Sequence, residues 1–146
     1  MRWRAAQYED LHRIVLADTP DMDVRGNLPD NETTAELLGN HSRTWEKDGR
    51  PIAIIGIAPM WKGVGTCWTL LSEESKGHGF ALTRSMYRVV EELHEERGYW
   101  RLQATVMRGD EPSRLWAVQL GFRYEGTMVA YGPDGSTHDM YARVRL

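Results

Sequence analysis

A strand, a glycine-rich segment and a long helix follow one another between Val64 and Arg97, and this order constrains the fold more than any other feature of the chain. Residues Val64 to Ser72 suit a buried strand, Gly77-His78-Gly79 predicts a loop, and an amphipathic helix is expected to begin near Phe80. Glycine lets the backbone approach a ligand closely, and the free amides of a helix start can bond to an anion. The pattern therefore predicts a binding site for a phosphate-bearing, nucleotide-type cofactor.

The spacing excludes two common phosphate-binding motifs. A Walker loop needs Gly-x-x-x-x-Gly-Lys-Ser/Thr and a Rossmann turn needs Gly-x-Gly-x-x-Gly, and neither is present. The helix is followed instead by a strand from Tyr99 to Met107, with Trp100, Leu102, Ala104 and Val106 expected on one face. A second helix is expected from Glu111 to Leu120, ended by Gly121 before Phe122.

This order of elements resembles the GNAT superfamily of N-acetyltransferases. The family carries Gln/Arg-x-x-Gly-x-Gly/Ala after its fourth strand, and Glu74-Ser75-Lys76-Gly77-His78-Gly79 occupies that place here. Leu115 to Phe122 resembles the family's later helix that ends in Gly-Phe, and Arg4 to Leu11 resembles its first strand and helix. Three further segments resemble small GNAT-like proteins of tailed bacteriophages, which include an internal virion protein: Pro51 to Gly56, Thr66 to Leu70 and Ser113 to Trp116.

The resemblance implies an α+β fold in one domain, residues 1 to 146, with a mixed, mostly antiparallel sheet of about seven strands flanked by about four helices. It implies acetyl-CoA as co-substrate, lying between the fourth and fifth strands with its pantetheine arm along Cys67 to Leu71. The candidate cofactor-binding residues on the strand are Thr69, Leu70 and Leu71. The candidates for the pyrophosphate are Lys76, Gly77, His78, Gly79 and Phe80, with the His78 side chain expected to face solvent.

Two catalytic groups common in the family are absent. Gly63 stands where many relatives carry a glutamate base, and Ala117 stands at the place of the tyrosine acid. Glu73 is a candidate substitute base, with a solvated loop residue as its alternative. Ser113 is a candidate proton donor, with a helix-start role as its alternative. The leading function is acetyl transfer to a primary amine of a small molecule or protein, and the alternative is a catalytically eroded phage protein that serves in binding or virion structure.

Composition limits the partners. The chain has 146 residues, 41% of them hydrophobic, and a net charge of −3, which argues against nucleic acid as a partner. It has no apolar run long enough for a membrane span, its single cysteine, Cys67, is expected to be a reduced and buried thiol, and its five histidines lack metal-ligand spacing. We therefore expect a cytoplasmic protein, or a virion component in the alternative case. The amine acceptor and the oligomeric state stay open, with a homodimer as one alternative.

The remaining segments complete the expected order of elements. A first strand is expected over Arg2 to Ala6, a helix over Tyr8 to Ala17, a loop over Thr19 to Pro29 and a short helix from Asp30 or Asn31 to Gly39. Four strands and two turns are expected beyond the segments named above: strands over His41 to Lys47, Pro51 to Ile57, Arg123 to Tyr131 and Thr137 to Arg145, and turns at Asp48-Gly49 and Pro59 to Gly65. On the long helix the glutamates, Glu91 among them, are expected to face solvent.

Overall fold

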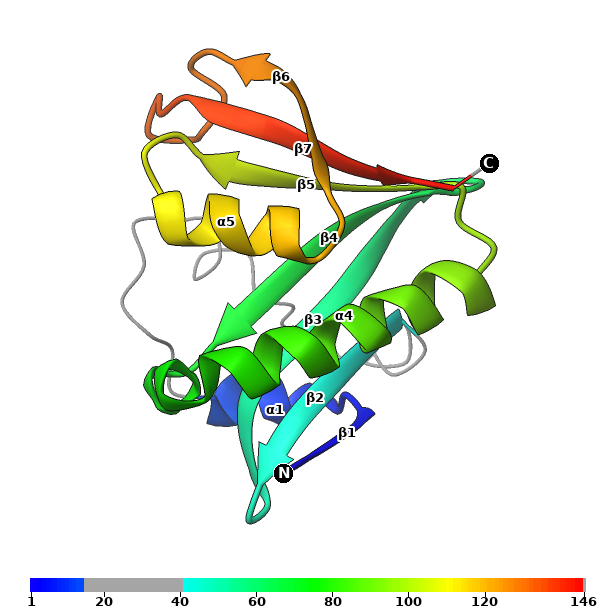
Figure 1. Ribbon diagram of the computed structural model, residues 1–146, viewed down its shortest axis with the longest axis vertical. Coiled ribbons are helices and arrows are strands. Elements are labelled where there is room, and N and C mark those ends of the chain that lie inside the picture. Colours follow the sequence, from blue (N-terminus) through cyan, green and yellow to red (C-terminus); the bar gives the residue numbers. More distant parts are fainter. Residues whose placement is uncertain (15–40, 146) are drawn as a thin grey trace.

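The computed structural model describes residues 1–14 and 41–145, which form a seven-stranded sheet with helices on both faces (Figure 1). The strand order is β1-β2-β3-β4-β5-β7-β6, and every neighbouring pair is antiparallel except β4 and β5. The expected mixed, mostly antiparallel α+β sheet is confirmed. The strands are β1 (Arg2–Ala5), β2 (Ser42–Lys47), β3 (Arg50–Trp61), β4 (Val64–Leu71), β5 (Arg101–Met107), β6 (Arg123–Met128) and β7 (His138–Val144).

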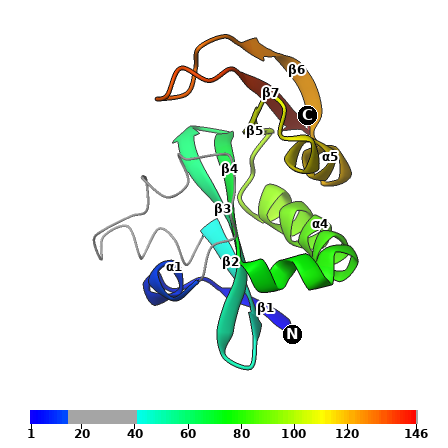
Figure 2. The ribbon, with the colours of Figure 1, turned by 90° about the vertical axis from the view of Figure 1, so that its left-hand side faces the viewer.

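Three α-helices and one 3-10 helix are found in the described residues: α1 (Tyr8–Arg13), the 3-10 helix η1 (Glu73–His78), α4 (Gly79–Glu96) and α5 (Glu111–Gln119). Figure 2 shows α4 and α5 on one face of the sheet and α1 on the other. None of these helices is both long and apolar enough to cross a membrane. The expected loop over Thr19 to Pro29, the helix to Gly39 and the end of the first helix at Ala17 lie outside the described residues.

The main core lies between the sheet and the pair α4 and α5. The expected apolar stripe of α4 is confirmed, because every member is at most 6% exposed: Leu82, Met86, Val89, Val90 and Leu93. A smaller core under α1 joins Leu11 and Ile14 to Ile54 and Leu70 of the sheet. The Asp48-Gly49 turn is also confirmed, with both residues at positive φ (51° and 75°) between β2 and β3.

The hairpin of β3 and β4 is longer than expected. β3 continues through Pro59 to Trp61, so the chain reverses at Lys62 and Gly63 and not over the whole of Pro59 to Gly65.

Trp100, expected among the buried residues of the fifth strand, precedes β5 and is 43% exposed. Its ring covers Gly63, where an added Cβ would lie 2.0 Å from the indole. β5 therefore begins at Arg101, two residues later than expected, and the first buried residue of the expected face is Leu102.

Glu91 is not part of a solvated face. Its carboxylate forms ion pairs with Arg143, which is 7% exposed, and with Arg145 at 2.8 Å. Arg143 also bonds to Nδ1 of His94 at 2.6 Å and to the carbonyl of Leu120 at 3.2 Å. At the end of the last strand the charged residue is the buried one, since Arg143 is 7% exposed while Val144 is 53% exposed.

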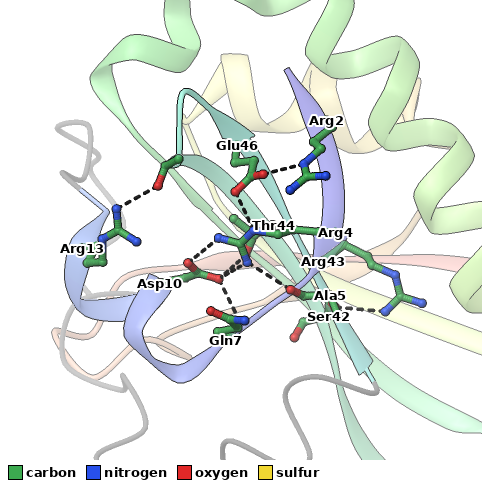
Figure 3. A network of polar contacts seen from close by, with 11 residues as sticks. Arg2, Arg4, Ala5, Gln7, Asp10, Arg13, Ser42, Arg43, Thr44 and Glu46 are labelled. Carbon is green, nitrogen blue, oxygen red and sulfur yellow. Dashed lines mark hydrogen bonds and ion pairs between the residues drawn. The ribbon is translucent and has the colours of Figure 1, made fainter.

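A buried carboxylate connects β1, α1 and β2 (Figure 3). Asp10, 1% exposed, accepts two bonds from the Arg4 guanidinium (2.7 and 2.8 Å), one from the Gln7 amide (2.8 Å) and one from the Thr44 hydroxyl (2.9 Å). Burial alone would raise the pKa of Asp10, but these bonds outweigh it and leave the pKa lowered. The network ties the edge strand β1 to the rest of the sheet.

Candidate functional site

The two parallel strands β4 and β5 separate after a short paired stretch. Backbone pairing runs from Val64 and Arg101 to Thr66 and Gln103 and then stops, although β4 continues to Leu71 and β5 to Met107. Figure 1 shows the resulting gap widening toward the carboxyl ends of both strands. From Cys67 to Leu71, β4 pairs with β3 on one side, and no strand within residues 1–14 and 41–145 pairs with it on the other. These residues, which include the predicted Thr69, Leu70 and Leu71, can pair with an extended ligand in the gap.

The segment after β4 is helical throughout and does not form the expected loop. Ser72 caps η1: its hydroxyl accepts from the amide of Ser75 at 3.3 Å and donates to the carbonyl of Ile52 at 2.8 Å. The chain passes from η1 directly into α4, with Gly79 in the right-handed helical region at φ −52°. The amides of Lys76, Gly77 and His78 therefore lie within a 3-10 turn, and the start of α4 is at Gly79, close to the expected Phe80.

Open space lies beside both glycines of this segment. A Cβ built on Gly77 or Gly79 meets no atom within 4 Å, and neither glycine has a positive φ. The local backbone thus does not need glycine, whereas a ligand that approaches it closely would. The neighbouring Phe80 is 83% exposed, and the half-buried His78 ring lies edge-on to Trp45 at 6.0 Å.

The two glutamates near the glycines are paired with cations. Glu74 contacts Arg50 at 3.0 Å and Lys47 at 3.5 Å, on the side of the β2 and β3 hairpin. Glu73 contacts Lys76 at 3.0 Å. Their charges are therefore partly neutralised where an anion would approach, and the segment fits a phosphate-bearing group.

We expect Lys76→Glu to weaken acetyl-CoA binding about tenfold, or about 1.4 kcal/mol, because it places another carboxylate beside Glu73 at the proposed pyrophosphate site. Glu74→Gln should change the affinity by less than about twofold, since Glu74 already faces Arg50 and Lys47. Titration calorimetry at low and high salt measures both, and the Lys76→Glu effect should shrink as salt screens it. Equal effects of the two changes would contradict the placement of the pyrophosphate.

Helix α5 is tied to the beginning of α4 by side chains that the sequence analysis did not single out. Nε1 of Trp116 donates to the Thr83 hydroxyl at 2.9 Å, which in turn donates to the carbonyl of Gly79 at 2.7 Å. The available signal was the indole N–H, because a partly buried tryptophan usually needs an acceptor. This chain holds α5 in place beside the glycine segment.

The candidate proton donor Ser113 is engaged at the start of α5. Asp110 is the N-cap of this helix, and its carboxylate accepts from the amide of Ser113 at 3.3 Å and from its hydroxyl at 2.6 Å. The hydroxyl proton of Ser113 is therefore directed at Asp110. This geometry matches the helix-start alternative.

Ala117 lies in the main core and is 8% exposed. A tyrosine introduced there would overpack the core, so Ala117→Tyr is not a route to a restored acid. Gly63, at the place of the family glutamate, is covered by the Trp100 ring.

Cys67 lies on β4 beside the gap, and the residue is partly exposed. Burial of its sulfur raises the pKa of the thiol to about 12. The thiol therefore stays protonated near neutral pH and is a poor nucleophile.

A concavity of about 510 Å³ is lined by residues of α4, β6 and β7, together with Gly121 before β6 and Arg145 after β7. None of the predicted site residues lines it. No group of three or more His, Cys, Asp or Glu side chains within residues 1–14 and 41–145 could hold a metal ion.

At the level of sequence, no family model and no curated protein matches the chain. Solved structures do match its fold over nearly the whole length. A ribosomal-protein-alanine N-acetyltransferase from Brucella melitensis superposes with a TM-score of 0.77 at 16% identity, covering 99% of this chain and 100% of that one. An acetyltransferase of the GNAT family from Streptococcus pneumoniae gives 0.77 at 18% identity, covering 98% of each chain. The fold is that of the GNAT acetyltransferases.

A chain from a NatC complex bound to a Gag peptide and CoA also superposes, with a TM-score of 0.71 at 11% identity over 99% of this chain and 98% of that one. The expected GNAT architecture is thereby confirmed at the level of the fold. At these identities, neither the reaction nor the acceptor follows from the likeness.

Proposed function

We propose that this protein is an N-acetyltransferase that moves the acetyl group of acetyl-CoA to a primary amine of a small molecule or protein. The observation that carries the proposal is the edge of β4 from Cys67 to Leu71, which faces the gap between β4 and β5 and pairs with no strand in the described part of the chain. The pantetheine arm would bond to this edge as an added strand. Its pyrophosphate would meet the backbone of Lys76 to Phe80, where the space beside Gly77 and Gly79 is open.

The reaction needs a neutral amine and a protonated leaving thiol. A lysine-like amine is only about one part in 2,500 neutral at pH 7. Glu73 stays the candidate base, although its carboxylate pairs with Lys76, and Ser113 stays a candidate donor only if its hydroxyl leaves Asp110. We propose that solvent removes most of the amine protons, with Glu73 as a secondary base, and that Ser113 is a secondary donor to the sulfur.

Binding of acetyl-CoA tests the proposal first. A ligand that binds only the folded protein raises stability by RT ln(1 + [L]/Kd), about 2.7 kcal/mol at 100 times Kd. We expect a concentration-dependent rise in Tm with acetyl-CoA, followed by mass-detected acetylation in a panel of small amines and peptides. No rise at millimolar acetyl-CoA would contradict the proposed cofactor.

Turnover should be slow and should rise close to tenfold per pH unit from pH 7 to 9, because the neutral amine fraction rises in that proportion. The measurement is kcat/KM for the best amine of the panel at fixed ionic strength, with acetyl-CoA affinity measured at each pH as the control. A plateau beginning below pH 8 would show that a protein group already supplies an efficient base.

The second candidate function is a binding or virion-structural role on a GNAT fold. It is favoured by Ala117 and Gly63, which stand at the places of the family acid and base. Confirmed acetyl-CoA binding without acetylation of any amine from pH 7 to 9 would favour this second function over catalysis.

A further inference from the structure

The concavity beside the end of β7 shares no residue with the proposed acetyl-CoA site. Its volume of about 510 Å³ is within the range of small-molecule sites. β6 begins at Arg123, which pairs with Ala142 of β7. The last two residues of β7, Arg143 and Val144, therefore have no partner on β6, and they line the concavity together with Tyr87 of α4.

Positive charge dominates this concavity, although the chain as a whole has a net charge of −3. Three arginines line it: Arg123, Arg143 and Arg145. The only carboxylate among the described residues of the lining is Glu125. The ion-pair partners of these residues add one charge of each sign, since Glu91 pairs with Arg143 and Arg145, and Arg101 pairs with Glu125. Two positive charges are thus left without a counter-charge.

Arg143 is a fixed cation in the wall. It is 7% exposed and donates to Nδ1 of His94 at 2.6 Å and to the carbonyl of Leu120 at 3.2 Å. Burial lowers the pKa of His94, so this imidazole adds no charge near neutral pH. The Arg143 guanidinium also lies 5.7 Å from the centre of the Tyr87 ring, which places a cation and an aromatic ring side by side in the wall.

The other two arginines have hydrogen-bond donors to offer. Arg145 is exposed and uses a single nitrogen, Nη2, for both oxygens of Glu91 at 2.8 Å. Arg123 is also exposed, and no hydrogen bond or ion pair joins its side chain to any group within residues 1–14 and 41–145. A guanidinium carries five N–H donors in a planar fork that fits two oxygens of a phosphate or carboxylate.

We propose that this concavity binds a small phosphate monoester, held by the guanidinium groups of Arg123 and Arg145. A phosphate monoester carries a charge of about −1.5 to −2 at pH 7, which matches the two uncompensated positive charges better than the single charge of a carboxylate does. The organic part of the ligand would lie against the Tyr87 ring, which is 43% exposed. The site is separate from acetyl transfer and does not rest on it.

The probe for this site is phenyl phosphate, with phenol as the uncharged comparison. Protein amide shifts in ¹H–¹⁵N NMR of the full chain at low salt report both the affinity and the place of binding. We expect a Kd of about 1 mM or below for phenyl phosphate, with shifts concentrated at Tyr87, Arg123 and Arg145, and no such shifts with phenol. An absence of these shifts at about ten times that concentration of phenyl phosphate would overturn the proposal.

Arg123→Gln should weaken phenyl phosphate at least about tenfold, because a hydrogen bond to a charged group contributes that much or more. Its Tm should be retained, since Arg123 is exposed and makes no ion pair with the described residues. Arg108→Gln is the matched control: Arg108 is 61% exposed and its amide bonds to Thr137, just before the other end of β7. This change removes the same charge and should leave the affinity unchanged. Equal losses in the two variants would show a general charge effect and overturn the site.

Lys76→Glu separates this site from the proposed pyrophosphate site, which could also take a phosphate. It should leave the phenyl phosphate shifts at Arg123 unchanged, and Arg123→Gln should leave acetyl-CoA affinity unchanged. Loss of the shifts at Arg123 in the Lys76→Glu protein would overturn the assignment. A wild-type protein that neither binds acetyl-CoA nor acetylates an amine would contradict the proposed function while leaving these shifts in place, so the two failures are distinguishable.

Discussion

The double variant Gly77→Val, Gly79→Val is expected to keep its fold and to bind acetyl-CoA at least about 100-fold more weakly than wild type, a loss of about 2.8 kcal/mol. Side chains at these positions meet no protein atom within 4 Å and require no change of backbone conformation. They would instead fill the space through which the proposed pyrophosphate reaches the backbone. Titration calorimetry measures the affinity, and thermal unfolding measures the stability.

Gly126→Val is the matched control for this experiment. Gly126 lies on β6, also has open space beside it and also lacks a positive φ, but it is remote in sequence and strand order from the gap. Its exchange should leave acetyl-CoA affinity unchanged. A double variant that unfolds at the wild-type temperature and binds with wild-type affinity would place the pyrophosphate somewhere other than Lys76 to Phe80.

Asp10→Ala is expected to lower the free energy of unfolding by about 3 to 5 kcal/mol, because it removes the acceptor from a buried network. Thr44, which is fully buried, would lose the partner of its hydroxyl, and Arg4 would keep its ion pair with Glu46. Urea unfolding followed by tryptophan fluorescence measures the change. The control is Arg2→Ala, which removes an ion pair to Glu46 from a side chain that is 75% exposed and should have no measurable effect.

The contribution of Asp10 should depend on pH in one direction. Its pKa is lowered in the folded state, so the stabilisation is fully present above the unfolded pKa of about 3.9 and is lost as pH falls through the folded value. The difference in unfolding free energy between wild type and Asp10→Ala should therefore be constant from pH 6 to 8 and should shrink below about pH 4. A difference that grew on acidification would contradict the ionised state of Asp10.

The local elements could be predicted from the sequence because their signals are local. The α4 stripe from Leu82 to Leu93 repeats at helical spacing, and Asp48-Gly49 has the residue types that a tight hairpin turn needs, so each is specified within a few residues. Together with the Glu74 to Gly79 motif, the order of the expected strands and helices was sufficient to indicate the GNAT fold. The helical state of Gly77-His78-Gly79 was missed because glycine permits a loop and a helix alike, and the Ser72 cap together with the packing of α4 decides between them.

What the sequence determined by itself was the order and type of most elements and the strand, glycine and helix arrangement at the proposed site. The place where β4 and β5 separate and the pairing of Glu91 with Arg143 are visible only in the three-dimensional structure. The physical reason is that periodicity specifies which face of an element is buried but not what covers it. Contacts between residues dozens of positions apart depend on how whole helices and strands pack, and a buried charge or hydroxyl takes its partner from whichever element lies opposite.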